Sequence, residues 1–295
     1  MTLAPEFESV QLADMMFSSA LGFLYYDHLL TLDAEIRLIW TRPKNTSRYL
    51  FFFNRYFAFV GNILAAISLY STPFSMSVCR TFELCHSIFL TLTQGLVTSL
   101  LALRVYALYG CNKIFLFVAM GGILLGIFAS VTIAIINKNS PSESTTSYEQ
   151  GCHVLESHTE ASHTAIAWEC IVVLDTLLFL ATLWKAYQYR LRPDVARLGV
   201  SLFAVVVRDG SIYFLIMASL NLVNIISYYT PGRVQGNLAS FVSCLSVTLM
   251  SRMMLGLHEA ADGGIYTNHH DDNAVLYNSS APGLDAAWVN RAYTH

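Results

Sequence analysis

The chain has 295 residues, of which 55% are hydrophobic and only 13% are charged. A soluble domain carries about 25% charged residues, so this composition excludes an ordinary soluble fold and indicates a protein whose main partner is the lipid bilayer. The net charge of −3 lacks the basic surface of a nucleic-acid-binding protein. The six cysteines form no CxxC pair and no zinc-ligand spacing, so no metal site and no cofactor is predicted.

Seven stretches are predicted to cross the membrane, because a spanning helix needs about 20 mainly apolar residues. Five of them contain a long run without Asp, Glu, Lys or Arg. The other two are interrupted by acids: Asp14 and Asp27 in the first stretch, Glu169 and Asp175 in the fifth. The predicted fold is an all-α bundle of seven transmembrane helices, at about residues 12–32, 50–72, 82–107, 114–136, 162–187, 203–228 and 236–254.

Lys and Arg gather in the loops after the first, third and fifth helices, and such loops face the cytoplasm. The opposite loops hold only Arg80, Lys138 and Arg233. The N-terminus is therefore predicted outside and the C-terminus in the cytoplasm, with the bundle ending near residue 257. The polar segment 258–295 is predicted to be a disordered cytoplasmic tail. The expected location is the plasma membrane or an endomembrane.

Four motifs carry a family resemblance: YDHLLTLDAEIRLIW at 26–40, FFFNRYFAFVGN at 51–62, LRVYALY at 103–109 and RDGSIYF at 208–214. The sequence resembles a large group of uncharacterised fungal membrane proteins. These are defined by a domain of unknown function around a Y-D-x-L-L-T-L-D-x-E-I…W…N-R-Y pattern. The resemblance covers most of residues 20–255. It implies a seven-helix membrane protein and brings no known activity with it.

Asp27 and Arg55 are the first pair of charges expected inside the membrane. Each lies roughly 10 Å from the cytoplasmic end of its helix at 1.5 Å per residue. An isolated charge at that depth is costly, so an ion pair between adjacent helices is predicted. The pair is interpreted as a structural link, with a role in switching or proton movement as the alternative.

Asp175 and Arg208 form the second candidate pair. Asp175 lies ten residues before Lys185, and Arg208 matches its depth if the sixth helix begins near Gly199. The alternative is that the sixth helix enters the membrane later and that Arg208 extends to the cytoplasmic interface.

The third predicted helix carries a polar stripe, which is expected to face the bundle interior. The stripe is either a source of hydrogen bonds between helices or a ligand or ion cavity that opens outward. The residues concerned are Glu83, His86, Ser87, Thr91, Gln94 and Thr98.

Two further features are predicted near these helices. Cys79 and Cys152 both face the outside in this topology, so a disulfide is expected between them, like the bridge in rhodopsin-like receptors. A face of small residues in the fourth helix allows close helix packing, either within the bundle or in a homodimer. That face comprises Gly122, Gly126 and Ser130.

The predicted function is receptor-like, with ligand sensing at the outer face and an unidentified cytoplasmic signalling partner. Arg104, at the cytoplasmic end of the third helix, lies where signalling receptors keep an arginine, although Leu103 and Val105 flank it. The alternative is a transporter or channel that uses the intramembrane Asp and Arg residues. An enzyme is disfavoured, because His86 is the only histidine well inside a clearly predicted span.

Overall fold

The computed structural model describes residues 3–41, 46–70, 76–139, 158–190, 200–230, 236 and 238–279. Within these ranges the side chains of residues 3–10, 200–211, 260–279 and a few other helix ends are not described. Cys152 and residues 280–295 of the predicted tail lie outside the described residues, and so does the side chain of Arg208.

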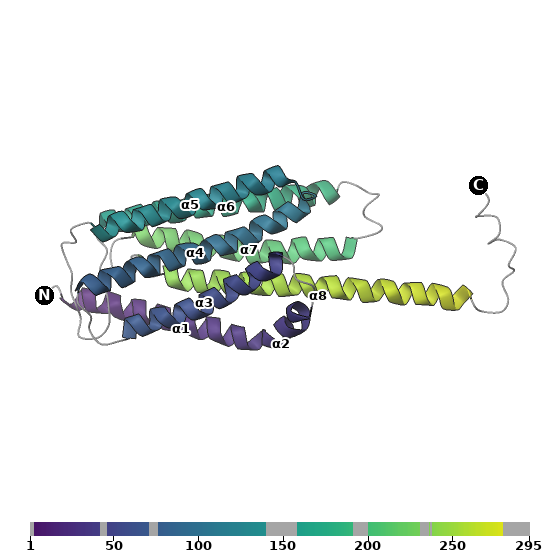
Figure 1. Cartoon of the computed structure of the whole chain (residues 1–295), viewed down its shortest axis with the longest axis horizontal. Coiled ribbons are helices and arrows are strands. Elements are labelled where there is room, and N and C mark those ends of the chain that lie inside the picture. Colours follow the sequence, from purple (N-terminus) through teal and green to yellow (C-terminus); the bar gives the residue numbers. More distant parts are fainter. Residues whose placement is uncertain are drawn as a thin grey trace.

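The regular structure of the described part is helical throughout. Seven long helices lie side by side in an elongated bundle (Figure 1). They are α1 (Leu3–Leu30), α3 (Thr46–Tyr70), α4 (Met76–Leu108), α5 (Lys113–Asn139), α6 (His158–Arg190), α7 (Val200–Tyr229) and α8 (Ala239–Ser279). The connection after α1 holds a short helix, α2 (Leu32–Glu35), and a π-helical turn, η1 (Ile36–Trp40). We call the end of the bundle that carries this connection the α2 end.

Six of the helices are long and apolar enough to cross a membrane: α3, α4, α5, α6, α7 and α8. The chain is therefore an all-α membrane protein. Helix α1 is not among the six, in keeping with the acids Asp14 and Asp27 that shorten its uncharged stretch. The outward face of α5 shows the composition expected next to lipid, since Ile114, Phe117 and Phe128 are largely exposed.

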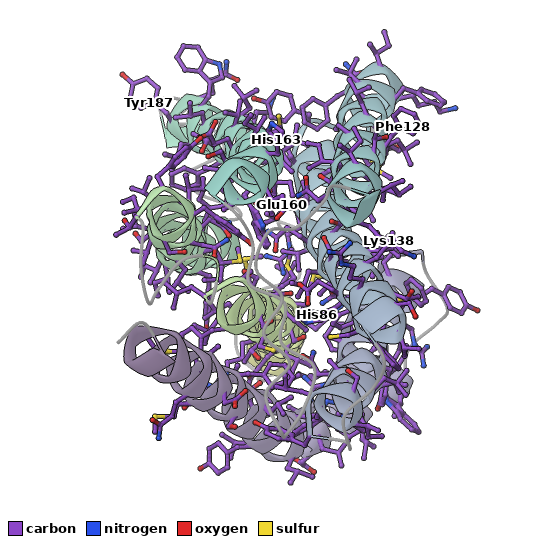
Figure 2. The ribbon with its side chains drawn as sticks, turned by 90° about the vertical axis from the view of Figure 1, so that its left-hand side faces the viewer. His86, Phe128, Lys138, Glu160, His163 and Tyr187 are labelled. Carbon is purple, nitrogen blue, oxygen red and sulfur yellow. The ribbon has the colours of Figure 1, made fainter. Side chains whose placement is uncertain are left out.

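Helix α8 is the central helix of the bundle. It contacts α1, α3, α4, α7 and η1, and Figure 2 shows it surrounded by the other helices. Between Val242 and Leu255 nearly all of its side chains are buried or half-buried, on every side of the helix. A helix that is buried all round must lie inside a bundle, so α8 can join the helices around it.

Two glycines allow neighbouring helices to approach closely. A Cβ atom at Gly61 of α3 would lie 2.0 Å from the ring of Phe89 of α4. A Cβ atom at Gly95 of α4 would lie 2.8 Å from Ile127 of α5. The turn from α4 to α5 also depends on glycine, because Gly110 has a φ of 69° at the end of the helix.

The helices differ in length from the predicted ones, most of all the last. Helix α8 continues to Ser279 and passes beyond the other helices (Figure 1), whereas the sequence analysis predicts disorder from residue 258. The stretch from Ala239 to Ser279 contains no proline, so the backbone can keep its helical hydrogen bonds although the side chains become polar.

Candidate functional site

Four charged residues form ion pairs near the α2 end, and we call them the ion-pair cluster: Asp27, Glu35, Arg55 and Arg252. Arg252 of α8 donates from Nε to Oδ1 of Asp27 in α1 over 2.5 Å. The Asp27 side chain is 3% exposed, whereas that of Arg252 is 42% exposed. This contact joins the first helix to the last and supplies a positive charge to a buried carboxylate.

The second pair in the cluster is fully buried. Nε of Arg55 lies 2.9 Å from Oε2 of Glu35, and the two side chains are 3% and 0% exposed. The N–H of Nε is not aligned with this oxygen, so the contact is an ion pair rather than a directed hydrogen bond. Arg55 directs its Nη2 group to the His28 carbonyl and to Thr31 Oγ1 at 2.9 and 2.7 Å.

Glu35 accepts two hydrogen bonds besides its ion pair. Trp40 Nε1 and the hydroxyl of Tyr56 each donate to Glu35 Oε1 over 3.1 Å. The local fold explains this position, because the segment of α2 and η1 packs against α3, where the Trp40 ring contacts that of Phe52. A carboxylate with two donors and a guanidinium is well stabilised even without water.

The partners in the cluster differ from the predicted ones. The sequence analysis pairs Asp27 with Arg55, whereas the structure pairs Asp27 with Arg252 and Arg55 with Glu35. Asp27 and Arg55 do lie near the same end of the bundle, but α8 lies beside α1 and brings a second arginine to Asp27. Glu35 and Arg252 were missed. A signal existed for Arg252, since it stands directly after the uncharged run of the last predicted helix.

A second set of buried polar side chains lies near the middle of the membrane-spanning helices. Asp175 of α6 is 6% exposed and accepts a hydrogen bond from Thr98 Oγ1 of α4 over 2.8 Å. Gln94, one turn before Thr98, lies within hydrogen-bonding reach of the same carboxylate. Asp175 has no cationic partner among the described side chains, and the proposed partner, Arg208, has its side chain outside that part.

Helices α7 and α8 add neutral polar groups to this set. Asn221 and Asn224 of α7 and Ser246 of α8 are 1%, 0% and 0% exposed. We call these three residues, together with Gln94, Thr98 and Asp175, the polar core. Asn221, Asn224 and Ser246 are not among the site residues predicted from the sequence. Their signal was amide and hydroxyl groups inside otherwise apolar spans, which are expensive unless they face one another or a ligand.

Several atoms of the polar core have no hydrogen-bond partner among the described residues. They are Gln94 Oε1, Asn221 Oδ1, both amide atoms of Asn224 and Ser246 Oγ. More than nine in ten buried polar groups in folded proteins have a partner, so five such atoms in one region are unusual. The polar core therefore has the capacity to bind water, an ion or a polar ligand.

The predicted polar stripe of α4 divides into two parts. Gln94 and Thr98 belong to the polar core, as described above. His86, toward the opposite end of the bundle, points to α8 (Figure 2), where its Nε2 lies 3.4 Å from Ser240 Oγ. Glu83, Ser87 and Thr91 are half-buried.

Arg104 is half-buried near the α2 end of α4. Its Nε donates to the sulfur of Met254 in α8 over 3.2 Å, and its buried Nη2 has no hydrogen-bond partner in the described part of the chain. A thioether is a weak acceptor. The guanidinium is therefore poorly satisfied in this conformation.

The remaining predicted features are a disulfide and a face of small residues in α5. Cys79 is disulfide-bonded, and its pairing with Cys152 stays a prediction because Cys152 lies outside the described residues. A Cβ atom at Gly122 would lie 3.6 Å from Leu174 of α6, so this glycine faces the bundle. Gly126 has open space around it, and the Ser130 hydroxyl donates to the Gly126 carbonyl over 2.9 Å. A search of the described residues finds no group of three or more His, Cys, Asp or Glu side chains arranged for a metal ion.

A family of unknown function, DUF6533, matches residues 17–60. This segment contains three members of the ion-pair cluster, Asp27, Glu35 and Arg55, whereas Arg252 and the polar core lie outside it. No curated protein and no solved structure matches the chain.

Proposed function

We propose that the protein is a receptor-like membrane protein with seven crossings, in which α1 is the additional one. Helix α1 has 28 residues, which corresponds to about 42 Å and exceeds the hydrocarbon thickness. Contacts to α3 occur along much of its length, and α8 lies beside it as well. The Ser18 hydroxyl lies 2.7 Å from that of Tyr70 near one end, and Arg55 reaches the His28 carbonyl near the other. With a seventh crossing the two ends of the bundle's chain lie on opposite sides of the membrane, and the Lys and Arg residues of the connections at the α2 end favour a cytoplasmic location for that end.

One observation carries the receptor-like role: the central helix α8 contributes to the polar core, to the ion-pair cluster and to the contact of Arg104. Ser246 belongs to the polar core, Arg252 to the ion-pair cluster, and Met254 receives the hydrogen bond of Arg104. Ser246 and Arg252 are six residues apart, which is about 9 Å along one continuous helix. A ligand that moves α8 at the polar core would therefore also strain the contacts at the α2 end.

Such a link is what a receptor requires. Signalling needs two arrangements of the bundle and a ligand that favours one of them. The Asp27–Arg252 ion pair provides a contact that can break, since Arg252 is 42% exposed and retains access to water or lipid headgroups. The buried Nη2 of Arg104 has no hydrogen-bond partner in the described part of the chain, so a second arrangement of the bundle that exposes it would offer this group to a cytoplasmic partner.

Transport is the second candidate, and Asp175 favours it. A carboxylate near the middle of a span is typical of ion and proton pathways. The two candidates differ in what crosses the membrane: a transporter carries its ligand through the bundle, whereas a receptor changes only the conformation at its inner end.

The test uses Cys111, which is exposed in the turn between α4 and α5 at the α2 end. The purified full chain, with the exposed Cys85 and Cys170 replaced by serine, is labelled there with an environment-sensitive fluorophore and placed in nanodiscs. Polar small molecules that raise the melting temperature are then added. The receptor-like role predicts a change in emission that Arg252→Gln reduces and Arg37→Gln, an exposed control, preserves.

A parallel measurement separates the alternatives. The same molecules are tested for uptake into sealed vesicles that contain the protein. Uptake that disappears in Asp175→Asn would replace the receptor-like role with transport. Binding without any response at Cys111 would contradict the receptor-like role directly.

A further inference from the structure

Four helices enclose the polar core. Helix α4 contacts α6 and α8, and α7 also contacts α6 and α8, so the four form a closed ring. Each helix of the ring contributes at least one buried polar residue near the middle of its span: Gln94 and Thr98 in α4, Asp175 in α6, Asn221 in α7 and Ser246 in α8.

Contacts between the helices show that these residues share one level. Phe179 stacks on Phe214 at 4.2 Å, and Tyr229 donates to Glu169, so the register of α6 against α7 is fixed at two points. Interpolation between these points places Asp175 opposite Asn221.

The register of α4 against α8 is also fixed at two points. His86 lies beside Ser240, and Arg104 donates to Met254. Between these two contacts, Gln94 falls opposite Ser246. Because Gln94 and Thr98 also adjoin Asp175, all four helices bring polar groups to the same depth.

The helical positions direct these side chains into the ring. On α4, Gln94 lies between the face that meets α8, marked by His86 and Arg104, and the face that meets α6, marked by Thr98. On α6, Asp175 lies between the face toward α4, marked by Lys185 over the Tyr109 ring, and the face toward α7, marked by Phe179. Exposed fractions of 6% or less are consistent with this inward direction.

The chemistry of the enclosed atoms is that of oxygen ligands with one negative charge. Gln94 Oε1, Asn221 Oδ1 and Ser246 Oγ have no partner among the described residues, and Asp175 supplies a carboxylate. Oxygen ligands suit hard cations rather than transition metals. A calcium ion commonly takes several carboxylates, whereas a single carboxylate is balanced by one positive charge. A neutral, protonated Asp175 would offer one donor to three acceptors.

We infer that the ring of α4, α6, α7 and α8 binds one monovalent cation, of the size of sodium, between the Asp175 carboxylate and the oxygens of Gln94, Asn221 and Ser246. The site lies within the polar core, but the inference does not rest on the receptor-like role, because a bound cation stabilises the bundle whether or not the protein signals. Mid-membrane burial of Asp175 is costly without a counter-charge, and the cation provides that charge within the bundle.

The experiment measures the melting temperature of the full chain in detergent micelles at constant ionic strength. Sodium chloride replaces choline chloride stepwise, and binding of radioactive sodium is measured on the same preparation. The wild type is expected to show a saturable rise in melting temperature and about one bound sodium ion. Asp175→Asn is expected to lose both, while Glu169→Gln, on the same helix but hydrogen-bonded to Tyr229, keeps both.

Two milder variants keep the test informative if Asp175→Asn does not fold. Gln94→Ala and Asn221→Ala retain the carboxylate and are expected to raise the sodium concentration at half-saturation at least fivefold. The inference is overturned if the wild type binds no sodium, if Asp175→Asn keeps the sodium-dependent rise, or if calcium alone produces it. A response in all variants alike would show a general salt effect and would also overturn it.

Discussion

Arg252 of α8 lies 2.5 Å from the Asp27 carboxylate of α1, and the two members of this pair differ greatly in exposure. The side chain of Asp27 is 3% exposed, while that of Arg252 is 42% exposed. The pair therefore has unequal partners: the aspartate depends on the arginine for its counter-charge, whereas the arginine retains access to water or lipid headgroups. Helix α8 thereby holds α1 against the bundle through a contact whose loss exposes the arginine to water but leaves the aspartate buried without its counter-charge.

This difference in exposure predicts that replacing Arg252 destabilises the protein more than replacing Asp27. Arg252→Gln leaves an uncompensated buried carboxylate, which is expected to reduce the stability by about 3 kcal/mol. Asp27→Asn leaves a half-exposed arginine that can extend toward water, and the expected loss is under about 1 kcal/mol. Melting temperatures in detergent micelles measure both, with Arg37→Gln as the exposed control. Equal losses, or a larger loss for Asp27→Asn, would refute the argument.

The Glu35–Arg55 pair predicts the opposite pattern, because both of its side chains are buried. Glu35→Gln and Arg55→Met each leave one buried charge without a counter-charge, so each is expected to lower the melting temperature strongly. The double variant removes both charges, and it is expected to lose clearly less than the sum of the two single losses. Additive losses in this double-mutant cycle would show that the 2.9 Å contact contributes little.

The sequence predicts that buried charges form ion pairs in this bundle, but it does not predict which residues pair with each other. The length of the uncharged runs predicts helices, because the bilayer imposes a length on any spanning segment. The need of Asp27 and Arg55 for partners follows from the cost of a buried charge. Which partner each one takes depends on the rotation of the helices and on the neighbours of α8. Sequence spacing gives depth alone, so the pairings with Arg252 and Glu35 were not predictable from it.

The polar core shows the same limit. Gln94 and Thr98 were recognised as a polar stripe because they recur at helical spacing within α4. Asp175 was recognised by its charge. Nothing in the local sequence indicates that Thr98 donates to Asp175, 77 residues away, since this contact exists only after α4 and α6 pack together. The amide of Asn221 inside an apolar helix indicates a buried polar position, but it does not indicate which side chains lie opposite.

The two glycines Gly61 and Gly22 offer a matched pair for the packing of the helices. Gly61→Ala would place a Cβ atom 2.0 Å from the Phe89 ring, which also contacts the rings of Phe57 and His86. The expected loss is about 1–3 kcal/mol. Gly22→Ala meets nothing within 4 Å and is expected to be neutral or slightly stabilising, since alanine favours a helix. Melting temperatures of both variants check this, and a neutral Gly61→Ala would contradict the close contact of α3 and α4.

Cys79 is disulfide-bonded, and the predicted partner is Cys152. Mass spectrometry of the unreduced, digested protein is expected to find the two peptides linked. Cys79→Ser is expected to reduce the stability by about 2–4 kcal/mol, the usual value for a native disulfide. Cys85→Ser, which replaces an exposed free cysteine of the same helix, is expected to have little effect. A linked peptide that contains Cys79 and a cysteine other than Cys152 would refute the pairing.

Replacement of Arg104 is expected to raise the melting temperature, unlike replacement of the other buried charges. Among the described residues its buried Nη2 has no hydrogen-bond partner, and its Nε donates to the weak acceptor sulfur of Met254. Arg104→Met removes the poorly satisfied charge and keeps a long apolar side chain, so the melting temperature is expected to rise by an amount equivalent to about 1 kcal/mol. Lys113→Met, an exposed change at the same end of the bundle, is expected to leave it unchanged.

The Arg104→Met variant also tests whether this arginine takes part in signalling. A group that costs stability in this conformation is expected to gain a partner in another one, so Arg104→Met should weaken the ligand-dependent change in emission at Cys111. A variant that is more stable and less responsive would assign Arg104 to the inner, signalling end of the bundle. A fall in melting temperature as large as that of Arg55→Met would instead show that Arg104 stabilises the present conformation, and the signalling assignment would then lose its basis.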